Sequence, residues 1–258
     1  MKADEILTSR LILDEYAKKL DDVLSVDVAI AGGGPSAMIA AHDLAKAGKK
    51  VAVFEKRLSP GGGMWGGAMG FNELVVEKEC EDIVEEMGIT YRMREDTIVA
   101  DSVEATGALI YRAVNTGARL MNMVNVEDVA IRDGRVNGLV INWTMVDVAR
   151  LLVDPLVVEA RAVVEATGHD CVVANHVLKH GYKLDTKSGD IVGEGAMWAE
   201  QGEYFVVEKT GPIFPGLYAS GMAVCGVHGG PRMGPIFGGM LKSGRKVAEM
   251  LIEELGGK

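Results

Sequence analysis

The part of this sequence that most constrains its fold is a glycine-rich turn between an apolar segment and a helical one. Residues 32–37 read Gly-Gly-Gly-Pro-Ser-Ala, a GxGxxA pattern. An expected buried strand at 27–31 precedes it, an expected helix at 35–47 follows it, and a second strand at 51–55 ends in Glu55. In this context the first glycine permits a tight turn, the second lets a phosphate approach the backbone, and the acidic residue holds ribose hydroxyls. The pattern predicts a βαβ unit that binds an adenine dinucleotide, and it leaves open which one.

The rest of the chain continues to alternate between expected strands and helices. Apolar residues at helical spacing behind Thr8 and Ser9 predict a first helix over about 9–24. Asp133-Gly134 suits a type I′ turn and predicts a β-hairpin over about 126–143. Further helices are expected at 77–86, 102–116, 171–179 and 235–255, and further strands at 118–123, 156–160, 162–166 and 217–220. We therefore expect one α/β domain over residues 1–258, with a Rossmann-like, mainly parallel sheet that carries the hairpin as an insert.

The charge balance argues against nucleic acid and anionic membrane as partners. The 258 residues hold 27 Lys and Arg against 37 Asp and Glu, a formal net charge of −10, and no basic block is present. No apolar run approaches the roughly 18 residues that a membrane span needs, and the first ten residues are charged rather than signal-like. These features predict a cytoplasmic protein.

Several strand ends resemble those of the two-dinucleotide-domain flavoproteins, which makes FAD the first cofactor to consider. Residues 166–168 read Ala-Thr-Gly at an expected strand end. In that superfamily, however, the late strand usually ends in Gly-Asp, whose carboxylate meets the flavin, whereas residues 219–222 read Ala-Ser-Gly-Met. The chain is also short for a flavin enzyme with a substrate domain. The fold type is therefore expected, while an FAD-dependent oxidoreductase stays an alternative function.

Longer motifs spread over nearly the whole chain resemble the thiamine thiazole synthase family. They read GGGMWGG at 61–67, NWT at 142–144, DP at 154–155, TGHD at 167–170 and PRMGPIFG at 231–238. The resemblance implies Fe(II)-dependent synthesis of ADP-5-ethyl-4-methylthiazole-2-carboxylate, a precursor of the thiamine thiazole, from NAD, glycine and a sulfur source. NAD is then a consumed substrate: it loses nicotinamide, and the ADP-ribose isomerises and condenses with glycine.

The resemblance also implies roles for individual residues. The implied nucleotide contacts are Ser36 at the phosphates, Glu55 and Lys56 at the adenosine end, Gly63 along the glycine-rich loop, the Val126 backbone at the adenine, and Met222. Asp154 and His169 resemble the family's iron ligands, contributed from neighbouring subunits, with Leu152 and Val153 on the same ligand-facing segment. Arg232 is expected to hold the glycine carboxylate. Because the family forms ring-like octamers, the resemblance implies a homo-octamer with shared sites.

These residue types suit the implied chemistry, although each also has an ordinary structural interpretation. A carboxylate and an imidazole suit Fe(II), and two protein ligands leave positions open for substrate and sulfide. A guanidinium holds a carboxylate through two parallel hydrogen bonds. Without the family, Asp154 before Pro155 is typical of a turn, His169 of a structural loop, and Arg232 of a surface ion pair. No residue can be assigned as general acid or base.

Position 152 decides the expected sulfur source. Some members of the family destroy one of their own cysteines, two positions before the Asp-Pro aspartate, and this chain has Leu152 there. Leucine has no sulfur to give, so we expect a multiple-turnover enzyme that uses external sulfide. The three cysteines, Cys80, Cys171 and Cys225, form no CxxC pair and are expected to be small buried residues, Cys171 included.

Two further functions stay open beside the flavin alternative. A sugar-phosphate isomerase would use the same cleft, since ketose formation is one step of the implied route. A non-catalytic NAD-binding protein would hold the nucleotide without consuming it and would tolerate loss of Asp154 or His169.

Overall fold

The computed structural model describes residues 4–256, so the outer bounds of the predicted domain, residues 1 and 258, lie outside it. The helices are α1 Glu5–Val23, α2 Pro35–Lys46, α3 Glu81–Met87, α4 Ser102–Thr116, α5 Thr144–Ala149, α6 Val172–Lys179, α7 Ala199–Lys209, α8 Met222–His228 and α9 Gly238–Glu254, with short 3-10 helices η1 Gly62–Gly66, η2 Lys78–Cys80 and η3 Gly168–Asp170. The strands are β1 Ser25–Ala31, β2 Val51–Glu55, β3 Glu73–Glu77, β4 Tyr91–Arg94, β5 Thr97–Asp101, β6 Arg119–Asn122, β7 Val124–Arg132, β8 Arg135–Trp143, β9 Leu156–Glu165, β10 Gly195–Met197, β11 Gly211–Phe214, β12 Leu217–Ala219 and β13 Pro231–Arg232.

A mainly parallel sheet organises the molecule, as predicted. Its strands follow the order β11-β12-β9-β1-β2-β6, and the five from β12 to β6 run parallel. The β7–β8 hairpin joins this sheet through antiparallel pairing of β8 with β9. Asp133 and Gly134 at its tip have φ angles of 50° and 72°, the positive values that a type I′ turn requires. The predicted α/β fold with a hairpin insert is therefore confirmed.

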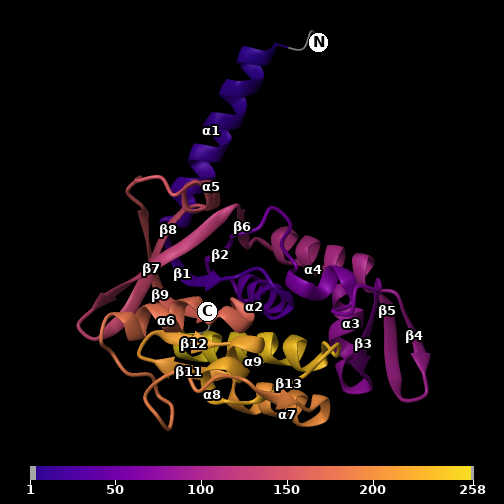
Figure 1. The fold of residues 1–258 in the computed structure, drawn as a ribbon. Helices are drawn as coiled ribbons and strands as arrows, with labels where there is room; N and C mark the ends of the chain where they lie inside the picture. The colour runs from indigo at the N-terminus through magenta and orange to yellow at the C-terminus, as the bar shows by residue number, and fades with distance from the viewer. Residues whose placement is uncertain (1–3, 257–258) are drawn as a thin grey trace.

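Helices cover both faces of the sheet (Figure 1), and the side chains of β1 alternate between the two resulting cores. Val28 and Ile30 pack with α2, α4 and α9, whereas Ala29 and Ala31 pack with α6, α8 and the hairpin. Strand β1 is buried almost throughout, as is usual for a parallel strand with helices on both sides. Its end, rather than its faces, is thus the place where a ligand can reach the sheet.

Strand β9 is a single strand of ten residues, whereas two strands broken at Arg161 were expected. Its first half alternates between buried and exposed residues beside the hairpin, and its second half is buried between β1 and β12. Arg161 takes an outward position in this alternation, and its guanidinium pairs with Asp27 at 3.1 Å. A charged residue on the exposed side of a strand therefore misled the prediction.

The expected βα alternation is wrong for the region after the glycine-rich loop. Strands from residues 73–101 form a separate antiparallel sheet in the order β3-β5-β4, and the expected helix at 77–86 lies between them as η2 followed directly by α3. The predicted final helix begins at Gly238 rather than at residue 235, and the predictions also missed α5, α7 and α8. The missed strands β3, β4 and β5 and helices α5 and α8 span only four to seven residues, so they carry little local periodicity.

Helix α1 projects from the body of the protein in Figure 1. It begins at Glu5, four residues before the expected start, because the Asp4 carboxylate caps it by accepting from the amides of Ile6 and Leu7. Val23 is its only buried residue, and apolar side chains such as Ile12 and Leu13 are more than 60% exposed. None of the helices within residues 4–256 is both long and apolar enough to cross a lipid bilayer.

Candidate functional site

The expected phosphate-binding loop lies at the end of β1, against the first turn of α2. Gly32 has a φ of 92°, and a Cβ there would come within 2.4 Å of the Ala166 carbonyl oxygen, so only glycine fits. Gly34 is the N-cap residue of α2, and none of the described side chains accepts a hydrogen bond from the first amides of the helix at this cap. Nothing lies within 4 Å of the position that a Cβ on Gly34 would take. The loop therefore leaves open space at a helix N-terminus, the environment that a phosphate prefers.

Three of the predicted nucleotide residues surround this loop. Ser36 is buried in the first turn of α2, and a Cβ on Gly221, which precedes Met222, would come within 2.4 Å of the Ser36 hydroxyl oxygen. The glycine-rich loop that carries Gly63 approaches from the other side, since the Gly61 amide donates to the Gly33 carbonyl at 2.7 Å. The structure thus gathers Ser36, Gly63 and Met222 around the loop from segments far apart in the sequence.

Glu55 organises the loop from the end of β2. One carboxylate oxygen accepts from the Gly33 amide and the other from the Arg57 amide, both at 2.7 Å. The side chain is only 7% exposed, and each oxygen retains a further lone pair. Glu55 therefore stabilises the loop, and its free lone pairs remain for the predicted ribose hydroxyls.

Lys56 and Val126 lie beyond Glu55. The Lys56 ammonium is 3.0 Å from the Asp170 carboxylate, which links the end of β2 to η3, the element that holds His169. Val126 is buried in β7, opposite Ile141 of β8 and beside a β-bulge. The Lys56–Asp170 ion pair thus joins the predicted nucleotide-binding end of β2 to the loop that carries His169.

His169 and Arg232 meet around one carboxylate that the sequence analysis did not identify. The Nδ1 atom of His169 lies 2.5 Å from one oxygen of Glu194, and the Nε atom of Arg232 lies 3.6 Å from the other. Both basic side chains are more than half exposed, whereas Glu194 is 18% exposed. Two of the predicted catalytic residues therefore lie together, and Glu194 joins them.

Asp154 lies elsewhere in the single chain. Residues 150–155 are exposed and form no helix or strand, and the Asn142 amide holds them by donating to the Val153 carbonyl at 3.0 Å. Leu152 projects fully into solvent. Within the described residues 4–256, no hydrogen bond or ion pair joins Asp154 to His169. The predicted pairing of these two residues between subunits stays a prediction.

Comparison with known proteins relates this chain to one family. The model of the Thi4 family matches residues 9–237. A thiamine thiazole synthase of Methanothermobacter thermautotrophicus is 52% identical over 257 residues, which cover 99% of this chain and 100% of that protein. This chain belongs to the Thi4 family. A thiamine thiazole synthase of Thermotoga maritima is likewise 52% identical, over 99% of this chain and 100% of its own length. The crystal structure of Thermovibrio ammonificans THI4 superposes with a TM-score of 0.96 at 48% sequence identity, and the match covers 98% of this chain and 99% of that one.

All three cysteines of this Thi4-family chain are buried, as expected. The Cys171 thiol is 2% exposed and lies 3.6 Å from the carbonyl oxygens of Gly168 and Ala223. Burial raises the pKa of each thiol, in Cys80, Cys171 and Cys225 alike, to about 12. A neutral, enclosed thiol is a poor nucleophile, which fits a packing role for Cys171.

Glu165 is a second carboxylate beside the His169 loop that the motifs did not reveal. It ends β9, is fully buried, and accepts hydrogen bonds from the Thr167 amide and hydroxyl and from the amides of Val173 and Ala174. Burial raises its pKa, while these donors act in the opposite direction. The side chain ties η3 to the start of α6 and so fixes the loop that presents His169. A charged residue directly after the apolar run at 162–164 was the available signal.

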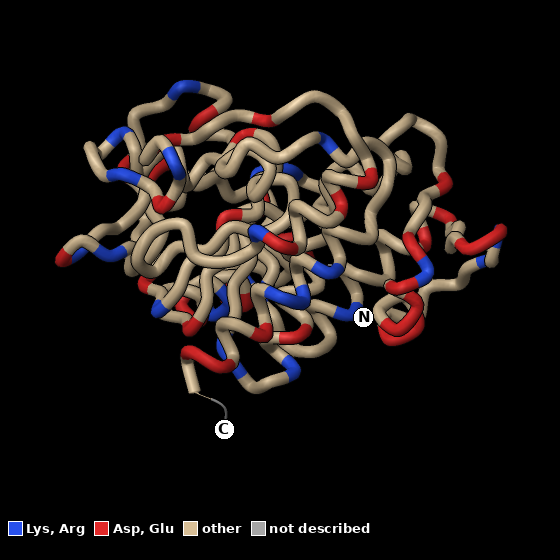
Figure 2. Tube along the Cα trace, turned by 90° about the horizontal axis from the view of Figure 1, so that it is seen from below, with Lys and Arg blue, Asp and Glu red and all other residues tan. Residues whose placement is uncertain are grey.

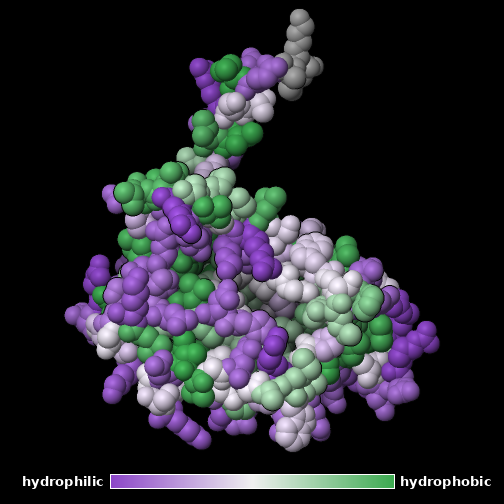
Figure 3. Space-filling model, in the orientation of Figure 1, coloured by the Kyte–Doolittle hydropathy of each residue, from purple (hydrophilic) through white to green (hydrophobic). Residues whose placement is uncertain are grey.

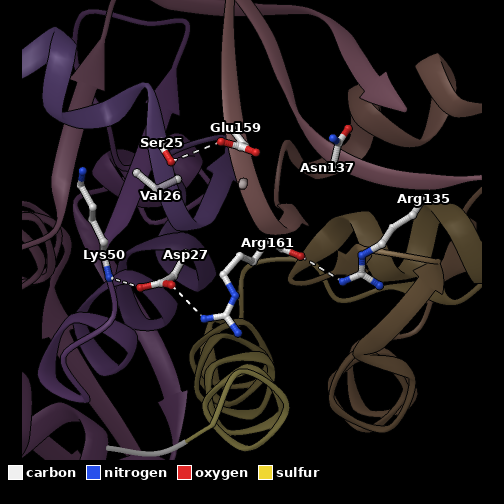
Figure 4. Close-up of a pocket in the computed structure, with 9 residues that line it drawn as sticks. Ser25, Val26, Asp27, Lys50, Arg135, Asn137, Glu159 and Arg161 are labelled. Atoms are coloured by element: carbon white, nitrogen blue, oxygen red, sulfur yellow. Dashed lines mark hydrogen bonds and ion pairs between the residues drawn. The ribbon is translucent and has the colours of Figure 1, made fainter. Parts of the chain in front are cut away.

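Two other clusters lie outside this family site. A pocket of about 530 Å3 is lined by Ser25, Asp27, Lys50, Arg135, Asn137 and Arg161 among others (Figure 4), at the opposite end of β1 from the phosphate loop. Most of its charged side chains are already paired: Asp27 with Arg161 inside the pocket, and Lys50 and Arg135 with Asp22 and Glu254 beside it. His42, Asp43 and Glu86 could geometrically hold a metal ion, but the Arg245 guanidinium pairs with both carboxylates. Acidic and basic residues are interspersed in the same way along the trace in Figure 2.

Proposed function

We propose that this chain is a thiamine thiazole synthase that makes ADP-5-ethyl-4-methylthiazole-2-carboxylate from NAD, glycine and external sulfide with Fe(II). The observation that carries the proposal is the pairing of His169 and Arg232 around Glu194, beside the Lys56–Asp170 boundary of the nucleotide site. Family membership supports the reaction class, and this grouping supports the substrates. It brings together an imidazole, which could bind a metal ion, and a guanidinium, which could bind a carboxylate, next to the end of the predicted dinucleotide site.

The nucleotide would lie across the carboxyl ends of β1 and β2. Its phosphates would contact the amides at the start of α2 and the Ser36 hydroxyl, and Gly63 and Met222 would flank them. Its adenosine end would meet Glu55, Lys56 and the Val126 backbone. In this arrangement the nicotinamide-bearing ribose would point toward the His169 loop, where NAD would be consumed as a substrate.

Asp154 and His169 would hold Fe(II), and the donor set fits this ion. His169 contacts the Glu194 carboxylate through Nδ1, and a carboxylate only accepts hydrogen bonds. The proton of the neutral His169 ring would therefore lie on Nδ1, which leaves the lone pair of Nε2 free to bind a metal ion. The exposed position of Asp154, with Leu152 and Val153 beside it, suits a ligand contributed to a neighbouring subunit. When bound, Fe(II) supplies Lewis acidity and open coordination positions. Nothing in the site identifies a general acid or base.

Arg232 would hold the glycine carboxylate. Its Nε atom faces Glu194, and its guanidinium is 53% exposed, so the terminal nitrogens remain free for a second carboxylate. The guanidinium would keep glycine beside His169, where the amine can meet the ribose-derived carbonyl. Holding both reactants there replaces a chance encounter with a proximity effect.

The sulfur would come from outside the chain. Leu152 carries no sulfur, and the Cys171 thiol is enclosed and neutral. Neither residue suits a single-turnover donor, which supports repeated turnover with sulfide.

A homo-octamer with shared sites is part of this proposal. Large apolar side chains are exposed on the projecting α1 and around α5, among them Ile12, Leu13, Val148, Leu152 and Val153. Figure 3 shows green, apolar atoms along α1 and at its base. Such patches are typical of surfaces that another chain covers. A cytoplasmic location stays a prediction.

One experiment tests the reaction and the sulfur source together. The protein is incubated anaerobically with NAD, carbon-labelled glycine, sulfide and Fe(II). The masses of the nucleotide products and of the intact protein are then measured by mass spectrometry. More than one equivalent of labelled ADP-thiazole carboxylate per chain is expected. At most one equivalent, with protein mass lost, would instead indicate an internal donor. Intact NAD without product would favour an FAD-dependent oxidoreductase, a sugar-phosphate isomerase or a binding-only protein.

A further inference from the structure

Glu194 occupies the space between the two basic side chains of the site. One oxygen is 2.5 Å from Nδ1 of His169, and the other is 3.6 Å from Nε of Arg232. Because the carboxylate is the least exposed of the three groups, it is the fixed member against which the other two are held.

The backbone around Glu194 is tied to the strand that carries Arg232. Strand β10, which starts directly after Glu194, pairs in parallel with β13. The Gly195 amide donates to the Gly230 carbonyl at 2.8 Å, and the Trp198 amide donates to the Arg232 carbonyl at 3.0 Å. Strand pairing therefore sets the separation of the Glu194 and Arg232 backbones, from which the two side chains reach one another.

This contact determines which atoms the two basic side chains present to substrates. A hydrogen bond from Nδ1 to a carboxylate fixes the tautomer and ring orientation of a metal-binding histidine and increases its strength as a ligand. Contact at Nε leaves the two terminal nitrogens of an arginine for a bound carboxylate. We propose that Glu194 is a positioning residue that orients His169 toward the metal and Arg232 toward glycine at the same time. This inference rests on the proposed function, because it takes the roles of His169 and Arg232 from there.

The decisive variant is Glu194→Gln, which keeps the shape of the side chain and removes one acceptor. A glutamine has one acceptor oxygen and one donor nitrogen, so it can satisfy His169 or Arg232 but not both. Glu194→Asp is the second variant, since it keeps the charge but shortens the reach to both partners. Glu200→Gln, an exposed position in the first turn of α7, is the matched control.

Two readouts separate positioning from a purely structural role. The first is Co(II) binding to the assembled protein, followed anaerobically by calorimetry and by the visible absorption of the bound ion. Both Glu194 variants are expected to raise the Kd about 10- to 100-fold, the range typical of lost outer-shell partners. The second is steady-state kinetics, in which Glu194→Gln is expected to raise the KM for glycine more than it lowers kcat. Circular dichroism and Tm are expected to match those of Glu200→Gln.

A double-mutant cycle with His169→Ala distinguishes the outcomes. If Glu194 acts through His169, Glu194→Gln weakens Co(II) binding in the wild-type background and not in the His169→Ala background. Two outcomes would overturn the role of Glu194 and leave the proposed function intact. In the first, Glu194→Gln weakens Co(II) binding equally in both backgrounds. In the second, His169→Ala weakens Co(II) binding but neither Glu194 variant changes it. Co(II) binding unchanged by His169→Ala would instead overturn the proposed metal site itself, and the role of Glu194 with it.

Discussion

Two carboxyl groups with buried oxygens, those of Glu77 and Glu203, are expected to make the stability of this protein depend on pH. Glu77 ends β3 and Glu203 lies in α7, and both meet the N-terminus of α9, where the Gly239 amide donates to Glu203. The other oxygen of Glu203 and one oxygen of Glu77 are buried without another partner. A single proton shared between these two oxygens would satisfy both, so we expect the folded protein to keep Glu203 protonated. Burial, together with the neighbouring Glu77, raises the pKa of Glu203 to about 8.

The sign and size of the effect follow from proton linkage. The ordinary pKa of a glutamate is 4.5, so between that value and about 8 the unfolded chain releases a proton that the folded chain retains. The stabilising contribution is fully present below pH 4.5 and is lost as the pH rises through 8. A pKa change of this size corresponds to on the order of 5 kcal/mol at most. Lys242 faces the pair and opposes the change, and the nearby Cys80 thiol is neutral across this range.

Glu203→Gln tests this reasoning directly, because its amide can donate to Glu77 and accept from Gly239 at every pH. The free energy of unfolding is measured by urea titration at half-unit steps from pH 5 to pH 9, with exposed Glu200→Gln as the control. The variant is expected to match the wild type within about 1 kcal/mol at pH 5 and to exceed it increasingly toward pH 9. A difference between variant and wild type that stays constant from pH 5 to pH 9 would refute the shared proton.

Three further predictions follow from the structure. Gly32→Ala is expected to lower stability by about 2 kcal/mol or more, because of its φ of 92° and the close Ala166 carbonyl, whereas Gly34→Ala, with a φ of −77° and open space, leaves the Tm nearly unchanged in thermal melts. Cys171→Ala is expected to retain repeated turnover, and a thiol reagent is expected to label the native cysteines only slowly; loss of product beyond the first equivalent would contradict this. Leu13→Glu on the exposed face of α1 is expected to shift the oligomer toward smaller species in light scattering, and an unchanged mass would argue against α1 as an interface.

The sequence alone was sufficient to predict the first βαβ unit. Its signals are local: Gly32 is required by a turn, Pro35 begins a helix, and Glu55 ends a buried strand within a span of about 25 residues. The small antiparallel sheet was not predictable in the same way, since its pairings depend on which segments the chain brings together. The Glu95–Asp96 turn between β4 and β5, where Glu95 has a φ of 54°, carries neither glycine nor proline to mark it.

The residues of the candidate site were predictable from the sequence only where a local motif marks them. Residues in ordered motifs, such as His169 and Arg232, could be named from the resemblance, whereas Glu194 could not. It lies 25 positions after His169 and precedes a strand of three residues, and only the pairing of β10 with β13 brings it to Arg232. Contacts that depend on tertiary pairing of very short elements leave no periodic signal in a single sequence.

The buried carboxylates of this protein differ in how they are satisfied, and that difference explains where its pH sensitivity is expected. Burying a charged carboxylate is costly unless donors surround it. Glu55 and Glu165 meet backbone amides or a hydroxyl at both oxygens, so each fixes a loop at the carboxyl end of the sheet. Glu77 and Glu203 each have an oxygen that faces no such donor. A proton must take the place of the missing donor there, and this proton makes the junction of β3, α7 and α9 respond to pH while donors hold the loops of the nucleotide site.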